Sequence, residues 1–188
     1  MAGEARLERV GNGLAPVTEG WFVVNARDAA WVHHDAFGFR CKFDTDGRVA
    51  SARPGLDPMM FPEVGYTLAV LEPGKPTGMY HAESSQEGFF VVSGECVAII
   101  EEEERMLRQF DFFHCPAGTR HVFVGAGEGP CVVLMVGNRV EQDEHWIAYP
   151  VSNVASKRGA AVAEETNSAH EAYATFGHWQ TGGERPNF

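Results

Sequence analysis

The chain has 188 residues, 44% of them hydrophobic, and a formal net charge of −11. This length suits one domain with its own core and leaves little room for a second. The acidic charge argues against nucleic acid and against anionic membrane surfaces as partners. The N-terminal residues lack an apolar stretch of signal-peptide length, and no apolar run approaches the ~20 residues of a membrane span. We therefore expect a cytoplasmic protein without a membrane partner.

Most of the predicted elements are short strands. Residues 1–20 are rich in glycine and charge, and we expect a flexible arm there. From Trp21 onward, aromatic and β-branched runs alternate with turn residues, which predicts strands. These runs cover residues 21–24, 37–43, 66–71, 89–92, 96–100, 105–110, 111–115, 121–124 and 131–136. Regular short strands favour a sandwich or a barrel over residues 21–150.

The pattern changes after Pro150. Ser152 is placed to cap a short helix that runs to Arg158, with Gly159 just past its end. Residues 168–171 have the S-x-x-E form of a capping box, which predicts a second short helix. Helices of this length are not stable alone. We therefore expect residues 151–188 to form a short helical segment that packs on the barrel.

The four cysteines do not form a C-x-x-C pair. Cys96, Cys115 and Cys131 lie in or beside apolar strand patterns, and Cys41 does the same near the first strands. A cysteine in this setting is usually a small buried hydrophobic residue. We expect all four to be reduced and structural.

Four side chains with metal-binding chemistry lie at two places in the strand-rich region. His81, Glu83 and Glu87 follow one another closely, and His121 comes after the turn at residues 116–119. Alternate residues of a strand share a face, so His81 and Glu83 are neighbours if that segment is extended. Two imidazoles and two carboxylates make a mixed nitrogen and oxygen site that suits a divalent metal ion such as Zn, Fe, Mn, Ni or Co.

The remaining histidines carry weaker signals. His114 lies two residues before Pro116, and we expect it in the core or in support of a metal ligand. The pair at residues 33–34 is expected at the surface or at a sheet edge. His145, His170 and His178 have no partner at metal-binding spacing and are also expected at the surface.

These residues carry a family resemblance. Within residues 74–94, His81, Glu83 and Glu87 lie close to the spacing of the first motif of the cupin superfamily. Residues 116–121 match the Pro-x-Gly-x-x-His of the second motif in full. The chain departs from the family pattern at Glu83, where the family has a second histidine. The resemblance implies an all-β chain, with a cupin-type double-stranded β-helix (jelly-roll) barrel, an N-terminal strand extension and short C-terminal helices.

The resemblance centres on residues 74–121 and leaves two functions open. One is a metalloenzyme of dioxygenase, isomerase or lyase type, with a divalent ion in the barrel mouth and a small-molecule substrate. Glu83 is then a fourth ligand or a catalytic base, and Phe90, Phe112 or Phe123 shapes the cavity. The alternative is a non-catalytic module that binds a small ligand, with Glu83 marking the loss of the metal. Members of the family commonly form homodimers, and we expect one here.

Overall fold

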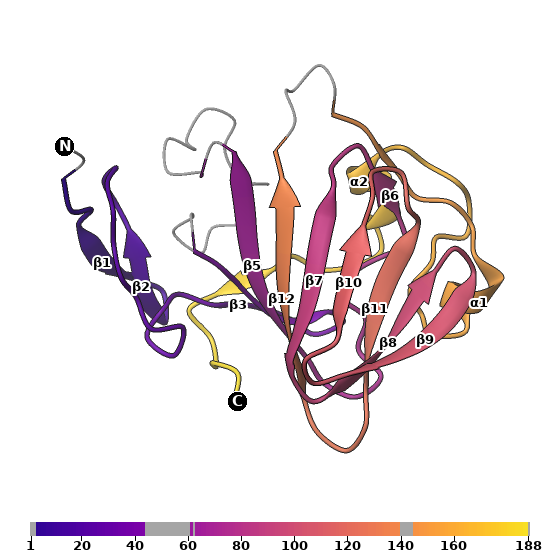
Figure 1. The fold of residues 1–188 in the computed structure, drawn as a ribbon, viewed down its shortest axis with the longest axis horizontal. Coiled ribbons are helices and arrows are strands. Elements are labelled where there is room, and N and C mark those ends of the chain that lie inside the picture. The colour runs from indigo at the N-terminus through magenta and orange to yellow at the C-terminus, as the bar shows by residue number, and fades with distance from the viewer. Residues whose placement is uncertain (1–2, 44–60, 62, 140–144, 188) are drawn as a thin grey trace.

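The computed structural model describes residues 3–43, 61, 63–139 and 145–187. Antiparallel strands dominate it, which confirms the all-β prediction (Figure 1). The strands are β1 (Leu7–Val10), β2 (Gly13–Pro16), β3 (Val32–His34), β4 (Gly38–Lys42), β5 (Val64–Leu71), β6 (Ala82–Glu83), β7 (Glu87–Ser93), β8 (Glu95–Ile100), β9 (Glu103–Arg108), β10 (Phe112–Cys115), β11 (His121–Ala126), β12 (Cys131–Asn138), β13 (Ile147–Ala148) and β14 (Gln180–Thr181). The helices are α1 (Asn153–Ser156) and α2 (Ala169–Ala172).

Two sheets enclose the main core. The larger has the strand order β10-β7-β12-β5-β4-β3-β14, and the smaller has the order β11-β8-β9. Buried side chains of β5, β7, β8, β10, β11 and β12 form one cluster between them, which comprises Leu71, Phe89, Val91, Cys96, Ala98, Cys115, Phe123, Cys131 and Val133. Isolated bridges from Pro76 to Val124 and from His81 to His121 tie the segment before β6 to β11. The segment that carries His81 is therefore attached to the smaller sheet at β11, the strand that begins with His121.

The period of two residues decides which aromatic rings enter this core. In the antiparallel pair β7–β10, Phe89 lies opposite Phe113 and Phe90 lies opposite Phe112. Phe89 is buried, whereas Phe112 is 64% exposed. Successive side chains of a strand point to opposite faces, so Phe90 and Phe112 belong to the outer face. Neither of them shapes the interior, contrary to the possibility that their sequence positions suggested.

The N-terminal segment is more ordered than an arm. We expected residues 1–20 to be flexible, but β1 and β2 pair there as an antiparallel hairpin. Gly11 has φ +57°, a conformation that glycine adopts without strain, and it provides the tight turn. Conversely, the strand expected at residues 21–24 is absent: Trp21 makes only a bridge to Glu4, and Val23 is 83% exposed.

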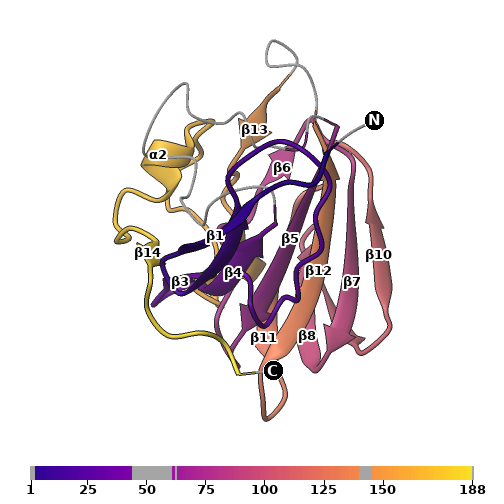
Figure 2. The ribbon, with the colours of Figure 1, turned by 90° about the vertical axis from the view of Figure 1, so that its left-hand side faces the viewer.

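The C-terminal segment follows the smaller sheet and then the edge of the larger one. Ser152 accepts a hydrogen bond from the Ala155 amide at 2.9 Å, and Ser168 accepts one from the Glu171 amide at 3.3 Å. Both predicted N-caps are therefore confirmed. Ala155 packs with buried residues of β8 and β11. Figure 2 shows the later part of the segment, with α2 and β14, beside β3 and β4.

All four cysteines are buried and none of them forms a disulfide, as expected. Cys96 and Cys131 lie together in the main core, where the hydrogen bond to Cys131, and secondarily burial, raises the pKa of Cys96. No helix in the described part of the chain has the length and hydrophobicity needed to cross a membrane.

Candidate metal centre

Two strand segments bring the candidate histidines face to face. His81 directly precedes β6, and His121 is the first residue of β11. Their backbones form a bridge, in which the His121 amide donates to the His81 carbonyl at 2.8 Å and the His81 amide donates to the His121 carbonyl at 3.2 Å. The ring centroids are 4.8 Å apart. This backbone pairing between the segment before β6 and β11 thus sets the separation of the two imidazoles.

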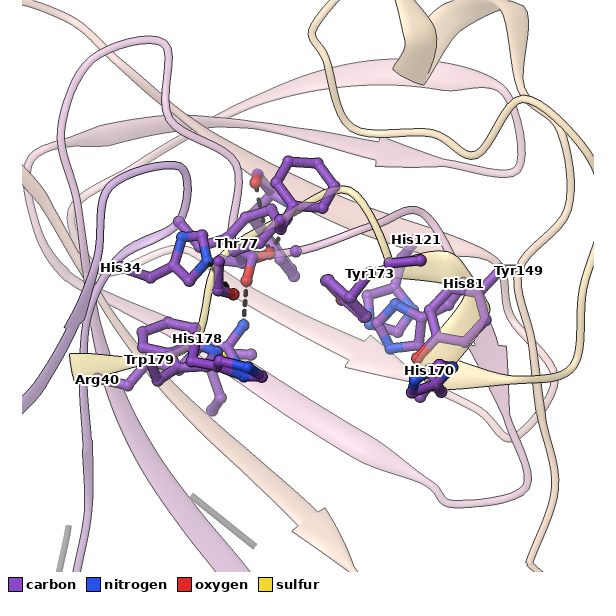
Figure 3. A pocket seen from close by; sticks show the side chains of 18 of the residues that line it. His34, Arg40, Thr77, His81, His121, Tyr149, His170, Tyr173, His178 and Trp179 are labelled. Carbon is purple, nitrogen blue, oxygen red and sulfur yellow. Dashed lines mark hydrogen bonds between the residues drawn. The ribbon is translucent and has the colours of Figure 1, made fainter. Parts of the chain in front are cut away.

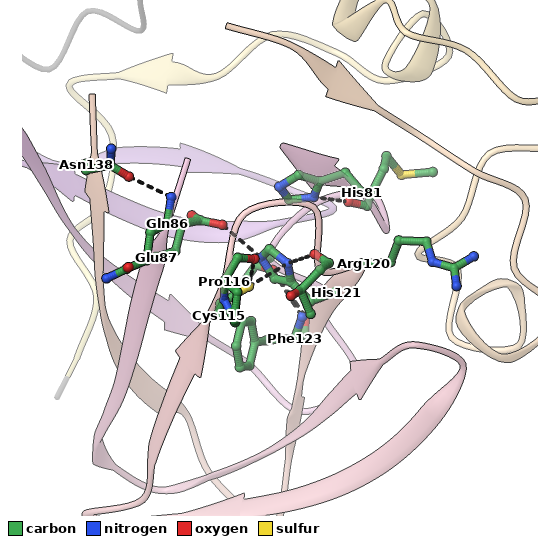
Figure 4. Close-up of polar contacts among 12 residues, drawn as sticks. His81, Gln86, Glu87, Cys115, Pro116, Arg120, His121, Phe123 and Asn138 are labelled. Atoms are coloured by element: carbon green, nitrogen blue, oxygen red, sulfur yellow. Dashed lines mark hydrogen bonds and ion pairs between the residues drawn. The ribbon is translucent and has the colours of Figure 1, made fainter. Parts of the chain in front are cut away.

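Each imidazole is oriented by a carbonyl two residues upstream. His81 Nδ1 lies 2.8 Å from the Met79 carbonyl oxygen, and His121 Nδ1 lies 3.0 Å from the Thr119 carbonyl oxygen (Figure 4). A carbonyl only accepts, so each Nδ1 carries the proton and each Nε2 keeps its lone pair. Burial lowers the pKa of both rings, that of His81 to about 4 with a further contribution from His121. Both rings are therefore neutral near pH 7, the form that binds metals.

Glu87 completes the group from the start of β7. Its Oε2 lies 3.3 Å from His121 Nε2, and this oxygen is buried without a hydrogen-bond donor among the described residues. Burial, and secondarily the charge of Glu83, raises the pKa of Glu87 to about 8. An ionised carboxylate at this position faces a lone pair and not a donor, so it needs a cation or a proton between them.

The donor set fits a divalent metal ion. One atom from each of His81, Glu87 and His121 lies within 4.8 Å of the other two. Two imidazole nitrogens and one carboxylate oxygen form a common ligand set for Zn, Fe, Mn or Ni. A divalent cation would satisfy the orphaned Glu87 oxygen and both Nε2 lone pairs at once. The Nδ1 hydrogen bonds supply the outer support that metal-bound histidines usually have.

Glu83 stands apart from this group. It does not belong to the set of donor atoms that lie within 4.8 Å of one another, and it is not one of the residues that line the adjacent cavity. Its backbone is fixed on both sides, because its carbonyl accepts from the Gly118 amide at 2.8 Å and its strand pairs with β13. Its charge still acts on Glu87 and His81. The structure thus places Glu83 next to the three donors without adding it to them.

The three donors lie in the wall of a cavity of about 760 Å³. Its lining comes from the strand core and from the C-terminal segment: His34, Phe37, Arg40, Thr77, Gly78, His81, Glu87, His121, Phe123, Met135, Tyr149, Ala169, His170, Tyr173, Ala174, Phe176, Gly177, His178 and Trp179. In Figure 3, His81, His121 and Tyr149 lie on one side, and Arg40, His34 and Trp179 lie on the other. The cavity can therefore hold a small molecule with one end at the donors.

Several residues of this cavity were not found by sequence reasoning. Arg40 gave no signal at all, and His34 was expected at the surface but is 5% exposed. His34 Nδ1 accepts from the Ala36 amide, so its Nε2 donates to the Gly177 carbonyl at 3.0 Å and holds the C-terminal segment. His170 and His178 are exposed, as expected, but border the cavity. A buried position for His34 could have been suspected from the apolar residues around it.

His114 also differs from the expectation, because it is exposed where a buried position was predicted. We expected it in the core or behind a ligand, but its side chain is exposed on β10. It shares the outer face of that strand with Phe112, while Cys115 faces inward. Cys115, and not His114, contacts the site: its Sγ lies 3.5 Å from His121 Nδ1.

The fold and the site together define an antiparallel two-sheet protein with a His/Glu/His donor group inside a cavity. Residues 67–137 match the family model of the cupin domain. The chain therefore contains a cupin domain, as the two sequence motifs indicated, and its other residues form the N-terminal strands and the C-terminal segment.

One solved structure supports the same fold, and a second has a slightly lower TM-score. An RmlC-like cupin from Shewanella frigidimarina is 14% identical, with a TM-score of 0.51 over 66% of this chain and 96% of that chain. A proposed sugar phosphate isomerase from Acidithiobacillus ferrooxidans is 21% identical, with a TM-score of 0.49 over 66% of this chain and 78% of that one. At such identities the likeness concerns the fold and not the activity. No curated protein matches the sequence.

Proposed function

We propose that this protein is a divalent-metal-binding cupin that acts as a small-molecule metalloenzyme of the dioxygenase, isomerase or lyase type. The observation that carries the proposal is the group of three acceptors, the buried His121 and the partly buried His81 and Glu87, which line a cavity and include a Glu87 oxygen without a donor among the described residues. Three protein ligands leave coordination positions open to a substrate, as catalytic metal sites do.

When bound, the ion would supply Lewis-acid polarisation of a substrate oxygen or a site for O₂. The chain itself would bind the ion through the three side chains and hold both rings through the Met79 and Thr119 carbonyls. Phe123, Met135 and the aromatic residues of the C-terminal segment would exclude water from the cavity.

We further propose Glu83 as the acid–base group of the reaction. Its charge contributes to the raised pKa values of Glu87 and Tyr149, which supports a place close to the reacting centre. A carboxylate beside the ion and outside the ligand set is free to accept a proton. The fourth-ligand role remains the competing interpretation of this residue.

The second candidate is a metal-free module that binds a small ligand without catalysis. It is favoured by the raised pKa of Glu87, because a protonated carboxyl can donate to His121 Nε2 and satisfy both groups without an ion. The cavity would then serve binding alone.

Metal analysis of the purified protein separates these candidates. We expect one divalent ion per chain in the wild type, and loss of it in Glu87→Gln and His121→Ala. His114→Ala is the matched control, because it removes an exposed histidine outside the site and should leave the metal content unchanged. Absence of metal from the wild type after growth and dialysis with Zn, Fe, Mn and Ni would reject the metalloenzyme and favour the metal-free module.

Glu83→Gln tests the role of Glu83. As an acid–base group, its replacement leaves the metal content unchanged and abolishes turnover once a substrate is in hand. As a ligand, its replacement lowers the affinity for the metal, which competition with a chelator would reveal.

The homodimer and the cytoplasmic location stay predictions. Exposed hydrophobic side chains at Met106, Phe110 and Phe112 on the outer face support association between copies. Analytical ultracentrifugation of the wild type should show twice the chain mass of 20.6 kDa, and sedimentation at the monomer mass would refute the dimer.

A further inference from the structure

The cavity has a second polar end, at Arg40 of β4. The guanidinium donates to the Thr77 carbonyl oxygen and lies over the Trp179 ring, with its carbon 4.6 Å from the ring centroid. Its Nε is buried without a hydrogen-bond acceptor. Among the described residues, no carboxylate forms an ion pair with it. The positively charged guanidinium therefore lines the cavity in contact with a carbonyl oxygen and an aromatic ring, and without a carboxylate partner among the described residues.

Burying a cation without an anionic partner is costly. Desolvation lowers the pKa of Arg40, although a guanidinium stays charged near neutral pH. If Arg40 served only to pin β4 to Thr77 and Trp179, an apolar side chain packed on Trp179 would do so at less cost. The arginine is better explained by a partner that enters the cavity.

Two tyrosine hydroxyls extend this end toward the metal centre. Tyr173 Oη accepts from the Met79 amide at 3.0 Å, so its own proton is free to be donated. The Tyr149 ring lies edge-to-face with Tyr173 at 5.9 Å and tilted against His81 at 5.8 Å, measured between ring centroids. Both tyrosines interact electrostatically with Arg40. Contacts between the rings of Tyr173, Tyr149 and His81 thus connect this part of the cavity to the donor group, with Tyr149 on the His81 side in Figure 3.

The backbone makes room for this arrangement at Gly78. A Cβ there would lie 2.6 Å from Tyr173 Oη and 3.5 Å from Arg40 Nη2. Because real side chains do not approach so closely, any residue other than glycine would displace the tyrosine hydroxyl. The close approach indicates that Arg40 and Tyr173 pack tightly against Gly78 in the cavity wall and leave no space for a larger residue at that position.

We propose that Arg40, with the hydroxyls of Tyr149 and Tyr173, forms a subsite for the anionic group of the small molecule whose other end reaches His81, Glu87 and His121. This rests on the proposed function for the metal-bound end only. The shared chemistry is an oxyanion, a carboxylate or a phosphate, which a guanidinium and hydroxyl donors bind through charge-assisted hydrogen bonds. In a chain with a net charge of −11, such a cationic pocket selects anions locally.

The test compares three probes of similar carbon skeleton: glycerol 3-phosphate, glycerate and neutral glycerol. Binding is measured by titration calorimetry on the metal-loaded protein and again after the metal has been removed with EDTA. We expect one or both anions to bind at least about tenfold more tightly than glycerol. The preferred anion identifies the phosphate or the carboxylate as the natural group.

Arg40→Met should remove this preference, and Arg40→Lys should keep part of it. Arg105→Met is the matched control, because it removes the same charge from an exposed position on β9. Tyr149→Phe keeps the ring and should weaken anion binding a few-fold without affecting glycerol, so the proposal stays testable if Arg40→Met does not fold.

The subsite proposal would be overturned if glycerol bound as tightly as the anions, or if anion binding were unchanged in Arg40→Met and Tyr149→Phe. It would also be overturned if Arg105→Met lost as much anion binding as Arg40→Met. Dependence on Arg40 that persists in the EDTA-treated protein supports it independently of the metal. A protein that never holds metal but shows this dependence would refute the metalloenzyme alone.

Discussion

Strands β7, β11 and β12 and the segment from Tyr149 to Trp179 line the same cavity, yet they are held in place in different ways. The strands lie in long backbone ladders, with one register shift in β12 between Val132 and Val133, and share a fully buried core. The C-terminal segment has two short helices, α1 and α2, and its later part is held by aromatic packing on Phe37 and by the hydrogen bond from His34. Two of the three candidate ligands, Glu87 and His121, therefore come from the strand ladders, and much of the cavity wall comes from a segment with few backbone pairings of its own.

The largest effect is expected from Phe89→Ala in the strand core. Phe89 is 1% exposed, and its ring lies 4.6 Å from Phe123 and 5.0 Å from His121. Its removal should lower the free energy of unfolding in urea by about 3–5 kcal/mol. Phe112→Ala removes an exposed phenylalanine from the neighbouring strand and should cost less than about 1 kcal/mol. Equal costs would show that the two faces of this sheet do not differ in packing.

A pH titration examines the donor group within that core. In the metal-free protein the pKa of Glu87 is raised from 4.5 to about 8, so its contribution to stability is lost as the pH rises toward 8. The pKa of His81 is lowered to about 4, so its contribution to stability is lost as the pH falls below its ordinary value of 6.5. The cleanest window is therefore pH 6.5 to 8, where we expect a loss of about 2 kcal/mol.

Urea unfolding of EDTA-treated protein across this window measures the loss. Glu87→Gln should abolish the slope, since it cannot ionise, and metal-loaded wild type should lack it as well. A slope that survives in Glu87→Gln would assign the titration to another group.

Phe176→Ala tests the C-terminal segment. This half-buried ring lies 4.8 Å from Phe37 and 6.2 Å from Tyr173, between centroids. Its loss should cost about 1–2 kcal/mol, less than that of Phe89, because less apolar area is buried. Hydrogen exchange should increase at residues 169–179 and stay unchanged in β7. Faster exchange in both regions would mean that they unfold as one unit.

The smallest effect is expected from Ser168→Ala, which removes the cap of α2. The loss of the hydrogen bond to the Glu171 amide should cost about 1 kcal/mol in urea unfolding. Ser168→Asp retains an acceptor and should unfold close to the wild type. An equal loss in both variants would point to packing, and not capping, as the role of this serine.

The metal-binding part was predictable because its residues carry local signals. His81, Glu87 and His121 occur at motif spacing, and the caps Ser152 and Ser168 depend on residues three positions apart. The face of each strand was less accessible, because β7 and β10 have phenylalanine at consecutive positions and hydrophobicity alone does not show which one points inward.

The Arg40 end was not predictable for a different reason. Arg40 meets Thr77 and Trp179, which are 37 and 139 positions further along the chain, and no local pattern reports such a meeting. His34 was misjudged on the same grounds, because its burial depends on Phe37 and on the distant Trp179. The position of Glu83 also depends on tertiary geometry. Its spacing from His81 and Glu87 does not show whether its carboxylate joins the donor atoms of His81, Glu87 and His121 or lies beside them.

The pairing of β14 with β3 also has a consequence for self-association. These few residues cover the border of the seven-stranded sheet, where Val32 and His33 would otherwise present unsatisfied amides and carbonyls. An exposed edge strand can pair with the edge strand of another molecule and start aggregation. A short strand that covers this edge hinders such pairing. Proteolytic removal of residues 168–187 would then turn the protein toward polymerisation through β3, in addition to opening the cavity.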